Sequence, residues 1–487
     1  MNTASAEASP QVNGIDLSKI KKLPIVISLI IGAFIAMLNE TVLNVAYTDL
    51  MADLNVTSTT VQWLSTGFML IVGILVPITA LLTQWFTTRQ MFLSAMIMFT
   101  LGTVLCGIAP QFSILLVGRL IQAVGTGLML PVMMNTILVI FPPEKRGAAM
   151  GSIGLVIMVA PAIGPTLSGL IVEHSSWRWL FYMVIPLAVF SVAFAAVYLK
   201  NVSDITKPKV DILSIILSTI GFGGVVYGFS SAGEGSGGWS EPEVYLTIAA
   251  GLISLILFAW RQLVIKSPML DLRAFKFPMF SLSVVLLMVI MMTLFSSLIM
   301  LPFYLRGALM LSAFTAGLVL LPGGVINGIM APVAGKLFDK FGPRAMVTPG
   351  IVMLIIILWF MSQLTTDAST GYVILLHCLL MIAISMIMMP GQTTGLNQLP
   401  RRFYPHGTAI MNTLQQVSGA IGTALFISIM SSRQTEYLES SSNPTAPSEI
   451  AESTAAGVQY AFFIGLLFAV GALVLSFFLK RVKPSEE

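Results

Sequence analysis

The sequence predicts an all-α polytopic membrane protein with fourteen transmembrane helices. Three observations predict this fold class: the composition, the length of the apolar blocks and the placement of Lys and Arg. Of the 487 residues, 56% are hydrophobic and only 9% are charged, and the mean hydropathy is +0.92. A soluble domain carries about 25% charged residues, so this chain lacks the polar residues needed to cover a water-exposed surface. A transmembrane β-barrel would instead show alternating segments of about ten residues.

The apolar residues come in blocks of about 20, the length that crosses about 30 Å of hydrocarbon as a helix. Taken in order along the chain, these blocks predict spans at residues 24–45, 61–83, 91–108, 113–137, 148–172, 179–199, 212–231, 244–264, 280–304, 312–335, 345–364, 371–395, 407–430 and 457–479.

The basic residues predict the orientation. If both termini are cytoplasmic, all but four of the 25 Lys and Arg lie on or near the inner side, because only Arg178, Arg306 and Arg433 lie outside and Arg119 lies within a span. Cytoplasmic loops of membrane proteins collect Lys and Arg. The pI of about 9.0 is therefore a sign of topology, and we expect the lipid bilayer, and no nucleic acid, as a partner.

The chain contains an internal repeat. Residues Gly73–Gln90 resemble Gly328–Ala345, and Arg146–Met150 resemble His406–Met411. These matches pair the second span with the tenth and the fifth with the thirteenth. Parallel halves of this kind are a known transporter plan, with the ligand site between the halves near the membrane midplane.

The repeat predicts six helices, a two-helix insert and six related helices. The expected domains are a cytoplasmic tail over 1–22, a bundle over 23–200, the insert over 201–266, a second bundle over 267–480 with a flexible or partly helical extracellular loop at 431–456, and a tail over 481–487.

The sequence argues against an enzyme. It carries no G-x-x-x-x-G-K-[ST] phosphate-binding loop, and its three His and two Cys show neither catalytic nor metal-binding spacing. We therefore expect a transporter that uses no metal and no cofactor.

Several motifs resemble those of the major facilitator superfamily, in particular the 14-helix drug:proton antiporters and, among these, lincomycin-type multidrug exporters of Gram-positive bacteria. The segment Leu38–Ala46 resembles the helix-1 motif, Gly118–Gly127 the helix-4 motif and Ser175–Pro186 the turn between helices 5 and 6. The resemblance implies the major facilitator fold and proton-coupled export of lipophilic, antibiotic-like drugs from a bacterial plasma membrane by a monomer. The alternative cargo is a lipid, a fatty acid or a siderophore.

The resemblance also implies roles for individual residues. It makes Arg119 the arginine linked to proton transfer, it suggests a pliable hinge in helix 5, and it suggests a gating loop after helix 10. The helix-1 motif residues are Asn39, Thr41 and Asn44, the hinge residues are Gly151, Gly154, Pro161, Gly164, Pro165 and Gly169, and the loop residues are Gly335, Asp339, Gly342 and Arg344. The alternatives are ordinary small-residue packing for the helix-5 residues and a solvated turn for the loop.

Glu40 is the residue that most needs an explanation. A charge in the middle of a membrane costs about 2.5–3.5 kcal/mol, and Glu40 and Arg119 are the only charged residues well inside the predicted spans. Counting about 1.5 Å per residue places both roughly 8–9 Å from the outer boundary. We therefore expect Glu40 to alternate between a protonated state and a charged state stabilised by Arg119 or by a cationic drug. The alternative is a static ion pair that only fixes helix packing.

Further polar and soft side chains are candidates for the lining of the drug cavity. Soft, Met-rich surfaces suit promiscuous binding, whereas intramembrane amides also serve as hydrogen bonds between helices. The candidates are Met129, Met133, Asn135, Asn327, Asn412 and Gln415.

Overall fold

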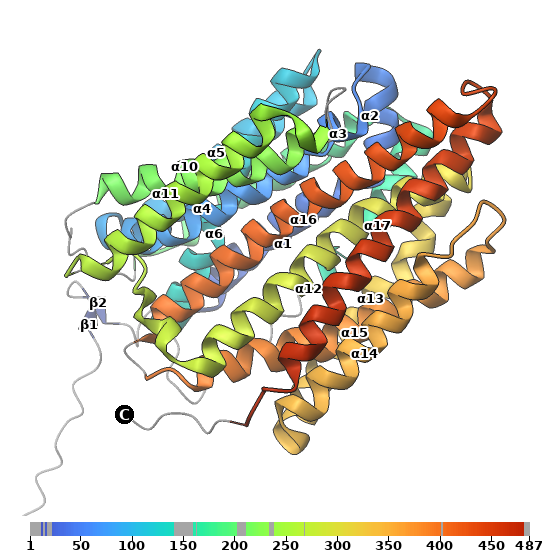
Figure 1. Ribbon diagram of the computed structural model, residues 1–487. Coiled ribbons are helices and arrows are strands. Elements are labelled where there is room, and N and C mark those ends of the chain that lie inside the picture. Colours follow the sequence, from blue (N-terminus) through green and yellow to red (C-terminus); the bar gives the residue numbers. More distant parts are fainter. Residues whose placement is uncertain are drawn as a thin grey trace, which may run out of the picture.

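The computed structural model describes residues 11–12, 15–16, 22–140, 159–161, 163–201, 211–232, 238–266, 268–400 and 403–481. The described part is a bundle of long helices that run side by side (Figure 1). Its long helices are α1 (Lys22–Val42), α4 (Trp63–Trp85), α5 (Thr88–Gly107), α6 (Phe112–Ile140), α9 (Val184–Tyr198), α10 (Ile212–Ser231), α11 (Pro242–Val264), α12 (Pro278–Phe303), α13 (Ala313–Phe341), α14 (Pro343–Met361), α15 (Thr370–Asn397), α16 (Tyr404–Ser440) and α17 (Pro447–Ser476). Residues 163–174 are also helical.

Short elements join the long helices. They are the two-residue strands β1 (Gln11–Val12) and β2 (Ile15–Asp16), the α-helices α2 (Tyr47–Leu54), α3 (Ser58–Val61) and α8 (Trp179–Tyr182), the 3₁₀ helices η2 (Gly238–Ser240) and η3 (Leu272–Lys276), and the π-helical turn η4 (Tyr304–Ala308). The two strands pair antiparallel.

The described residues contain 13 helices long and apolar enough to cross a membrane. They fall on thirteen of the fourteen predicted spans. The remaining prediction, 148–172, lies partly outside the described residues, and its described parts, 159–161 and 163–172, are helical. β1 and β2, next to the start of α1, lie at the same end of the molecule as the end of α17 (Figure 1), and this arrangement requires an even number of crossings.

The bundle of helices has two ends. The β1 end carries β1, β2 and the end of α17, and the α2 end carries α2, α3 and the turn between α16 and α17 (Figure 1). Likewise, the N-half is α1 to α9 and the C-half is α12 to α17.

The two halves meet along two seams. In one seam, α4 packs against α16, and a Cβ added to Gly73 would lie 2.9 Å from the Val417 side chain. In the other, the helix at 163–174 packs against α13. These pairs are second with thirteenth and fifth with tenth, and the sequence repeat interchanges them. The two seams are therefore equivalent positions in the two halves.

The insert α10–α11 covers one of these seams. α10 packs against both α4 and α16. In the same region Gln62 Nε2 donates to Ser230 Oγ at 3.1 Å, and the centroids of the Trp63 and Tyr227 rings lie 6.0 Å apart. α11 lies outside α10 and exposes large apolar side chains such as Ile256 and Trp260, as expected of a helix surrounded by lipid.

At the α2 end the first helix is shorter than predicted, and the segment at 431–456 follows the partly helical alternative. The first helix stops at Val42, and residues 43–46 form turns before α2 begins. The expected loop at 431–456 is mostly helical, because α16 continues to Ser440 and α17 starts at Pro447. Hydrogen bonds between the two extensions, such as Tyr437 to Glu452 at 2.6 Å, explain why this polar segment is ordered.

Candidate functional site

The candidate site centres on Arg119, which lies in α6 and is fully buried. Its Nη1 donates to Asn39 Oδ1 at 2.6 Å and to the Asn39 carbonyl oxygen at 3.3 Å, and its Nε donates to the Leu64 carbonyl oxygen at 3.2 Å. The guanidinium carbon lies 4.3 Å from the centroid of the Phe68 ring. Hydrogen bonds from a charged donor are the strong ones in a low-dielectric interior, so Arg119 holds α1, α4 and α6 together.

Further polar contacts hold the Arg119 side chain in place. Gln122, one turn along α6, accepts from Arg119 Nη1 at 3.0 Å and donates to Thr103 Oγ1 of α5 at 2.7 Å. Two buried donors of the network, Arg119 Nη2 and Asn39 Nδ2, have no hydrogen-bond partner. A buried donor without a partner costs free energy.

Glu40 lies next to this network without forming an ion pair in it. The residue is 8% exposed, whereas Asn39 and Arg119 are 0% exposed. The ion pairs formed by described residues do not include Glu40. Adjacent residues of a helix point about 100° apart, so Asn39 faces Arg119 while the Glu40 side chain takes another direction. The static Glu40–Arg119 pair is therefore not the arrangement of this structure.

Of the other two helix-1 motif residues, Thr41 lies close to the fifth helix. A Cβ added to Gly164 would lie 2.3 Å from Thr41 Oγ1, so this glycine makes room for Thr41. Thr41 also donates to the Leu38 carbonyl oxygen at 3.4 Å. Asn44 is 5% exposed, and its Oδ1 is buried without a donor.

The helix-5 motif places backbone against backbone at the α2 end. A Cβ on Gly169 would lie 2.2 Å from the Ala313 carbonyl oxygen, and one on Gly317 would lie 2.5 Å from the Pro165 carbonyl oxygen. Between them Thr166 Oγ1 donates to the Gly317 carbonyl oxygen at 3.0 Å.

Small residues of this kind allow membrane helices to approach closely. Pro161 is half-buried and Pro165 is buried, while Gly151 and Gly154 lie outside the described residues.

The predicted gating loop lies at the β1 end, between α13 and α14. Gly342 joins the two helices with φ +83°, a conformation that favours glycine. The Arg344 guanidinium lies 5.8 Å from the centroid of the Phe477 ring. A Cβ on Gly335 would meet open space, and the Asp339 side chain lies outside the described part.

Comparison with known proteins decides the family. The family model described as Major Facilitator Superfamily matches residues 29–423. The chain belongs to this superfamily.

Among curated relatives, the superfamily member "Lincomycin resistance protein LmrB" of Bacillus subtilis (strain 168) is 58% identical over 463 residues, which cover 95% of this chain and 97% of that protein. The protein of the same name from Listeria monocytogenes is 52% identical over 465 residues, covering 96% and 98%.

Two solved structures show the major facilitator fold. A D-xylose–proton symporter matches with a TM-score of 0.67 and 14% identity over 96% of this chain and 99% of that chain. A bacterial homologue of the human lysosomal transporter Spinster matches with a TM-score of 0.68 and 14% identity over 93% and 95%. Membership of a transporter superfamily confirms the prediction that this chain is a transporter and not an enzyme.

The structure places the tentative cavity residues of this major facilitator in different surroundings. Met129 and Met133 are fully buried in the N-half core. Asn327 accepts from Ser385 Oγ at 2.7 Å, which joins α13 to α15. The remaining three differ again: Gln415 Oε1 lies 3.5 Å from Gln392 Nε2 and its Nε2 is unpaired, Asn412 is half-buried, and the Asn135 side chain lies outside the described part.

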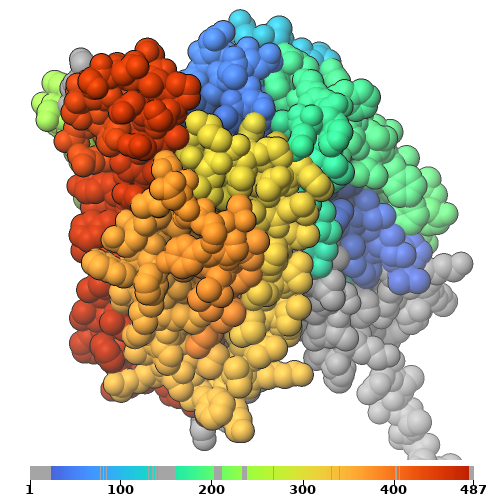
Figure 2. All heavy atoms as spheres, turned by 90° about the vertical axis from the view of Figure 1, so that its right-hand side faces the viewer, coloured from blue at the N-terminus to red at the C-terminus, as the bar shows by residue number. Residues whose placement is uncertain are grey.

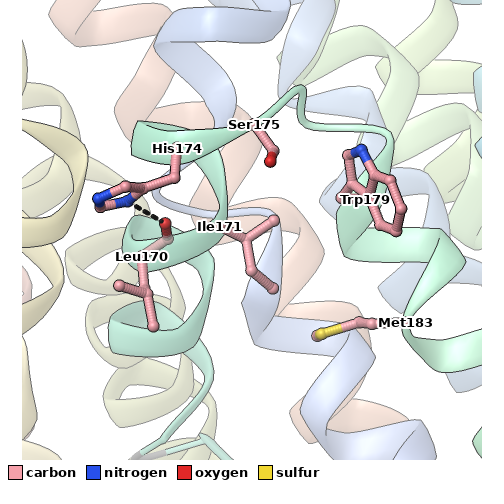
Figure 3. Close-up of a pocket in the computed structure, with 6 residues that line it drawn as sticks. All are labelled: Leu170, Ile171, His174, Ser175, Trp179 and Met183. Atoms are coloured by element: carbon pink, nitrogen blue, oxygen red, sulfur yellow. Dashed lines mark hydrogen bonds between the residues drawn. The ribbon is translucent and has the colours of Figure 1, made fainter.

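A separate cavity opens at the α2 end between the helix at 163–174 and α8–α9 (Figure 3). Its volume is about 320 Å³, and its lining is mainly apolar. The His174 ring turns back to hydrogen-bond with the Leu170 carbonyl oxygen at 3.0 Å. The cavity is formed by Leu170, Ile171, His174, Ser175, Trp179 and Met183. Three of these, Ser175, Trp179 and Met183, belong to the segment that resembles the family's turn between helices 5 and 6, and none is among the candidate coupling, gating or cavity residues predicted from the sequence.

Sequence reasoning missed most partners of Arg119. Gln122 lies within the helix-4 segment that resembles the family motif, three residues after Arg119, so the i, i+3 spacing could have indicated it. The Leu64 carbonyl and the Phe68 ring come from α4, 55 and 51 positions earlier in the chain, and no local pattern indicates that pairing.

Proposed function

We propose that this major facilitator exports lipophilic, antibiotic-like small molecules across a bacterial plasma membrane in exchange for protons. The observation that carries the proposal is the 58% identity, over nearly the whole of both chains, to a protein named for lincomycin resistance. Lincomycin is therefore the first cargo to test.

Glu40 is the proposed proton carrier. A buried carboxyl is favoured in its protonated form unless a cation is near, and the open Nη2 of Arg119 lies in the network next to Glu40. Protonated Glu40 needs no counter-charge, whereas charged Glu40 needs Arg119 or a cationic cargo. Because one proton moving through 100 mV supplies about 2.3 kcal/mol, a single exchange can drive a more than tenfold gradient of a neutral drug.

Asn39 and Arg119 are proposed to hold the site in place. Asn39 occupies the acceptor position on Arg119, so Glu40 can change its charge while the helix packing stays intact. In this arrangement the contact that packs the helices, Asn39 with Arg119, is separate from the group that titrates, Glu40. In a direct Glu40–Arg119 ion pair one residue would serve both purposes.

We also propose an orientation and a pivot. The α2 end faces the outside and both termini face the cytoplasm, in keeping with the Lys and Arg distribution. The close contacts at Gly169 and Gly317 lie at the outer end of one seam, where they act as a pivot and a seal during alternating access. The loop at Gly342 and Arg344 acts as the gate at the cytoplasmic end.

Transport by the purified chain in liposomes tests the function. An imposed pH gradient is expected to drive lincomycin or another drug of a panel, and collapse of the gradient by an ionophore is expected to stop it. Glu40→Gln is expected to abolish gradient-driven transport with an unchanged gel-filtration profile. Glu436→Gln, in an exposed ion pair with Arg433, is the matched control and should transport normally.

The refuting results are specific. Undiminished gradient-driven transport by Glu40→Gln would remove this residue from the mechanism. Transport that does not respond to the gradient would contradict antiport, and transport of a lipid, fatty acid or siderophore in place of every drug would change the cargo class.

A further inference from the structure

Arg306 joins the two halves at the α2 end. It lies in η4, the continuation of α12 in the C-half. Its Nη2 donates to Asp49 Oδ1 at 3.0 Å and its Nη1 donates to Asp49 Oδ2, so the guanidinium forms a bidentate ion pair with this carboxylate of α2. The Arg306 side chain is only 14% exposed, and a paired, partly buried fork of this kind is stronger than a surface ion pair.

The same guanidinium holds the interruption of the first helix. Arg306 Nη1 also donates to the Val45 carbonyl oxygen at 3.0 Å. Val45 lies in the turns at 43–46, where the backbone leaves α1 and enters α2. This turn begins three residues after Glu40, so Arg306 contacts the segment that continues directly from the proposed proton site.

A second link between the halves lies beside the first. Glu173, at the end of the helix at 163–174, accepts the backbone N–H of Phe314 at 2.8 Å and so caps the first turn of α13 across the seam. Hydrogen bonds from Ser312 and Phe314, together with the nearby charges of His174 and Arg306, hold the pKa of Glu173 below its usual value.

The two halves also meet at the surface of the α2 end. In Figure 2 the blue segment that contains α2, the green segment around residues 163–182 and the yellow segment around η4 meet at the top of the molecule. The hydrogen bonds that cross between the halves within the described part gather at this end. At the opposite end Gly335 faces open space.

We propose that Arg306 is a gate residue of the transport cycle: it holds the α2 end closed through Asp49 and keeps the interruption of α1 next to Glu40 in place through Val45. When the halves separate at this end, Arg306 must leave both acceptors. Opening of the gate and release of the first-helix turn are then one event. This inference rests on the proposed function for its meaning, although its test does not need transport.

The test measures the distance between the halves at the α2 end. Spin labels are placed on Gln111→Cys of the N-half and Asp367→Cys of the C-half, both exposed, after replacement of the two native cysteines by alanine. The full chain is measured in lipid nanodiscs without drug and without a pH gradient. Because a hydrogen bond to a charged group contributes about 1.5–3 kcal/mol, Arg306→Gln and Asp49→Asn are each expected to raise the ratio of open to closed molecules by about tenfold.

Matched variants keep the result interpretable. Arg433→Gln removes another arginine of the α2 end, whose partner Glu436 lies on the same helix, and should leave the distances unchanged. Arg306→Lys keeps the charge without the fork and should give a smaller shift. Exchange of the pair, Asp49→Arg with Arg306→Asp, should restore part of the closed population, which a merely structural role would not predict.

The link to the proton site has its own readout. Glu40→Gln is expected to change the open-to-closed ratio in the otherwise native chain and to change it less in the Arg306→Gln background. Additive effects would overturn the link, and wild-type distances in both Arg306→Gln and Asp49→Asn would overturn the gate. A shift of distances in a chain that shows no proton-driven transport would support the gate and contradict the proposed function, so the two failures are distinguishable.

Discussion

Gly169→Ala is the sharpest test of the seam between the fifth helix and α13. The added methyl group would lie 2.2 Å from the carbonyl oxygen and 2.7 Å from the carbonyl carbon of Ala313, and 2.8 Å from Cα of Phe314. All three are backbone atoms, which cannot rotate away as a flexible side chain can. The two helices would have to separate by about 1 Å to restore ordinary contact distances of 3.4–4 Å.

The magnitude follows from two opposing terms. Overpacking of a close contact costs about 1–3 kcal/mol, and Ala is favoured over Gly inside a helix by about 1 kcal/mol. The net expectation is a destabilisation of up to about 2 kcal/mol. Gly471→Ala in α17 is the matched control, because a Cβ there meets nothing within 4 Å, so only the stabilising helix term remains.

Thermal unfolding in detergent, followed by scattering and by helical circular dichroism, measures both variants. Gly169→Ala should unfold at a lower temperature than the native chain, and Gly471→Ala at the same or a higher one. Gly169→Ala should also raise the ratio of open to closed molecules at the α2 end, measured as the distance between spin labels on Gln111→Cys and Asp367→Cys. Equal unfolding temperatures for the two variants would refute the reasoning that the seam is closed by backbone contact.

Two further predictions concern single contacts. Gly323 makes room for His377, whose ring carbon Cδ2 would lie 2.2 Å from an added Cβ. Gly323→Ala should therefore destabilise the fold by about 1–3 kcal/mol, and His377→Ala in the same chain should recover part of the loss. Additive losses in thermal unfolding would contradict the contact. Asp53 accepts from Trp177 Nε1 at 2.9 Å, and this bond together with the neighbouring arginine lowers the pKa of its carboxyl. A lowered carboxyl pKa gives stability that is complete above the ordinary value of about 4 and is lost as the pH falls through the lowered value. Asp53→Asn should therefore flatten the loss of stability below about pH 4, and an unchanged acid-side profile would show that other carboxylates account for it.

The class of protein and its helices can be predicted from the sequence alone. The apolar blocks set the spans because no other structure satisfies the backbone polar groups in lipid. The depth of Glu40 and Arg119 also followed from the sequence, since a helix rises by a fixed distance per residue. The repeat between Gly73–Gln90 and Gly328–Ala345 predicted two related halves, and the two seams follow the same pairing.

Which side chains contact one another depends on how the helices pack. Asn39, not Glu40, faces Arg119, because a shift of one residue turns a helix side chain by about 100°. The break of the first helix at 43–46 carries no Gly or Pro to indicate it, and it is held instead by buried packing and by Arg306 from the other half. Met129 and Met133 illustrate the same limit, since composition does not show which side chains they pack against in the N-half core.

The reason is the range of the interactions. Hydropathy, helix rise and the loop charges act along the chain or on the chain as a whole, so they can be read from neighbouring residues. The ion pair of Asp49 with Arg306 joins residues 257 positions apart, and the close approach of Gly169 to Ala313 depends on how two rigid helices cross. Such contacts exist only once the halves are packed together, so no pattern within either segment contains them.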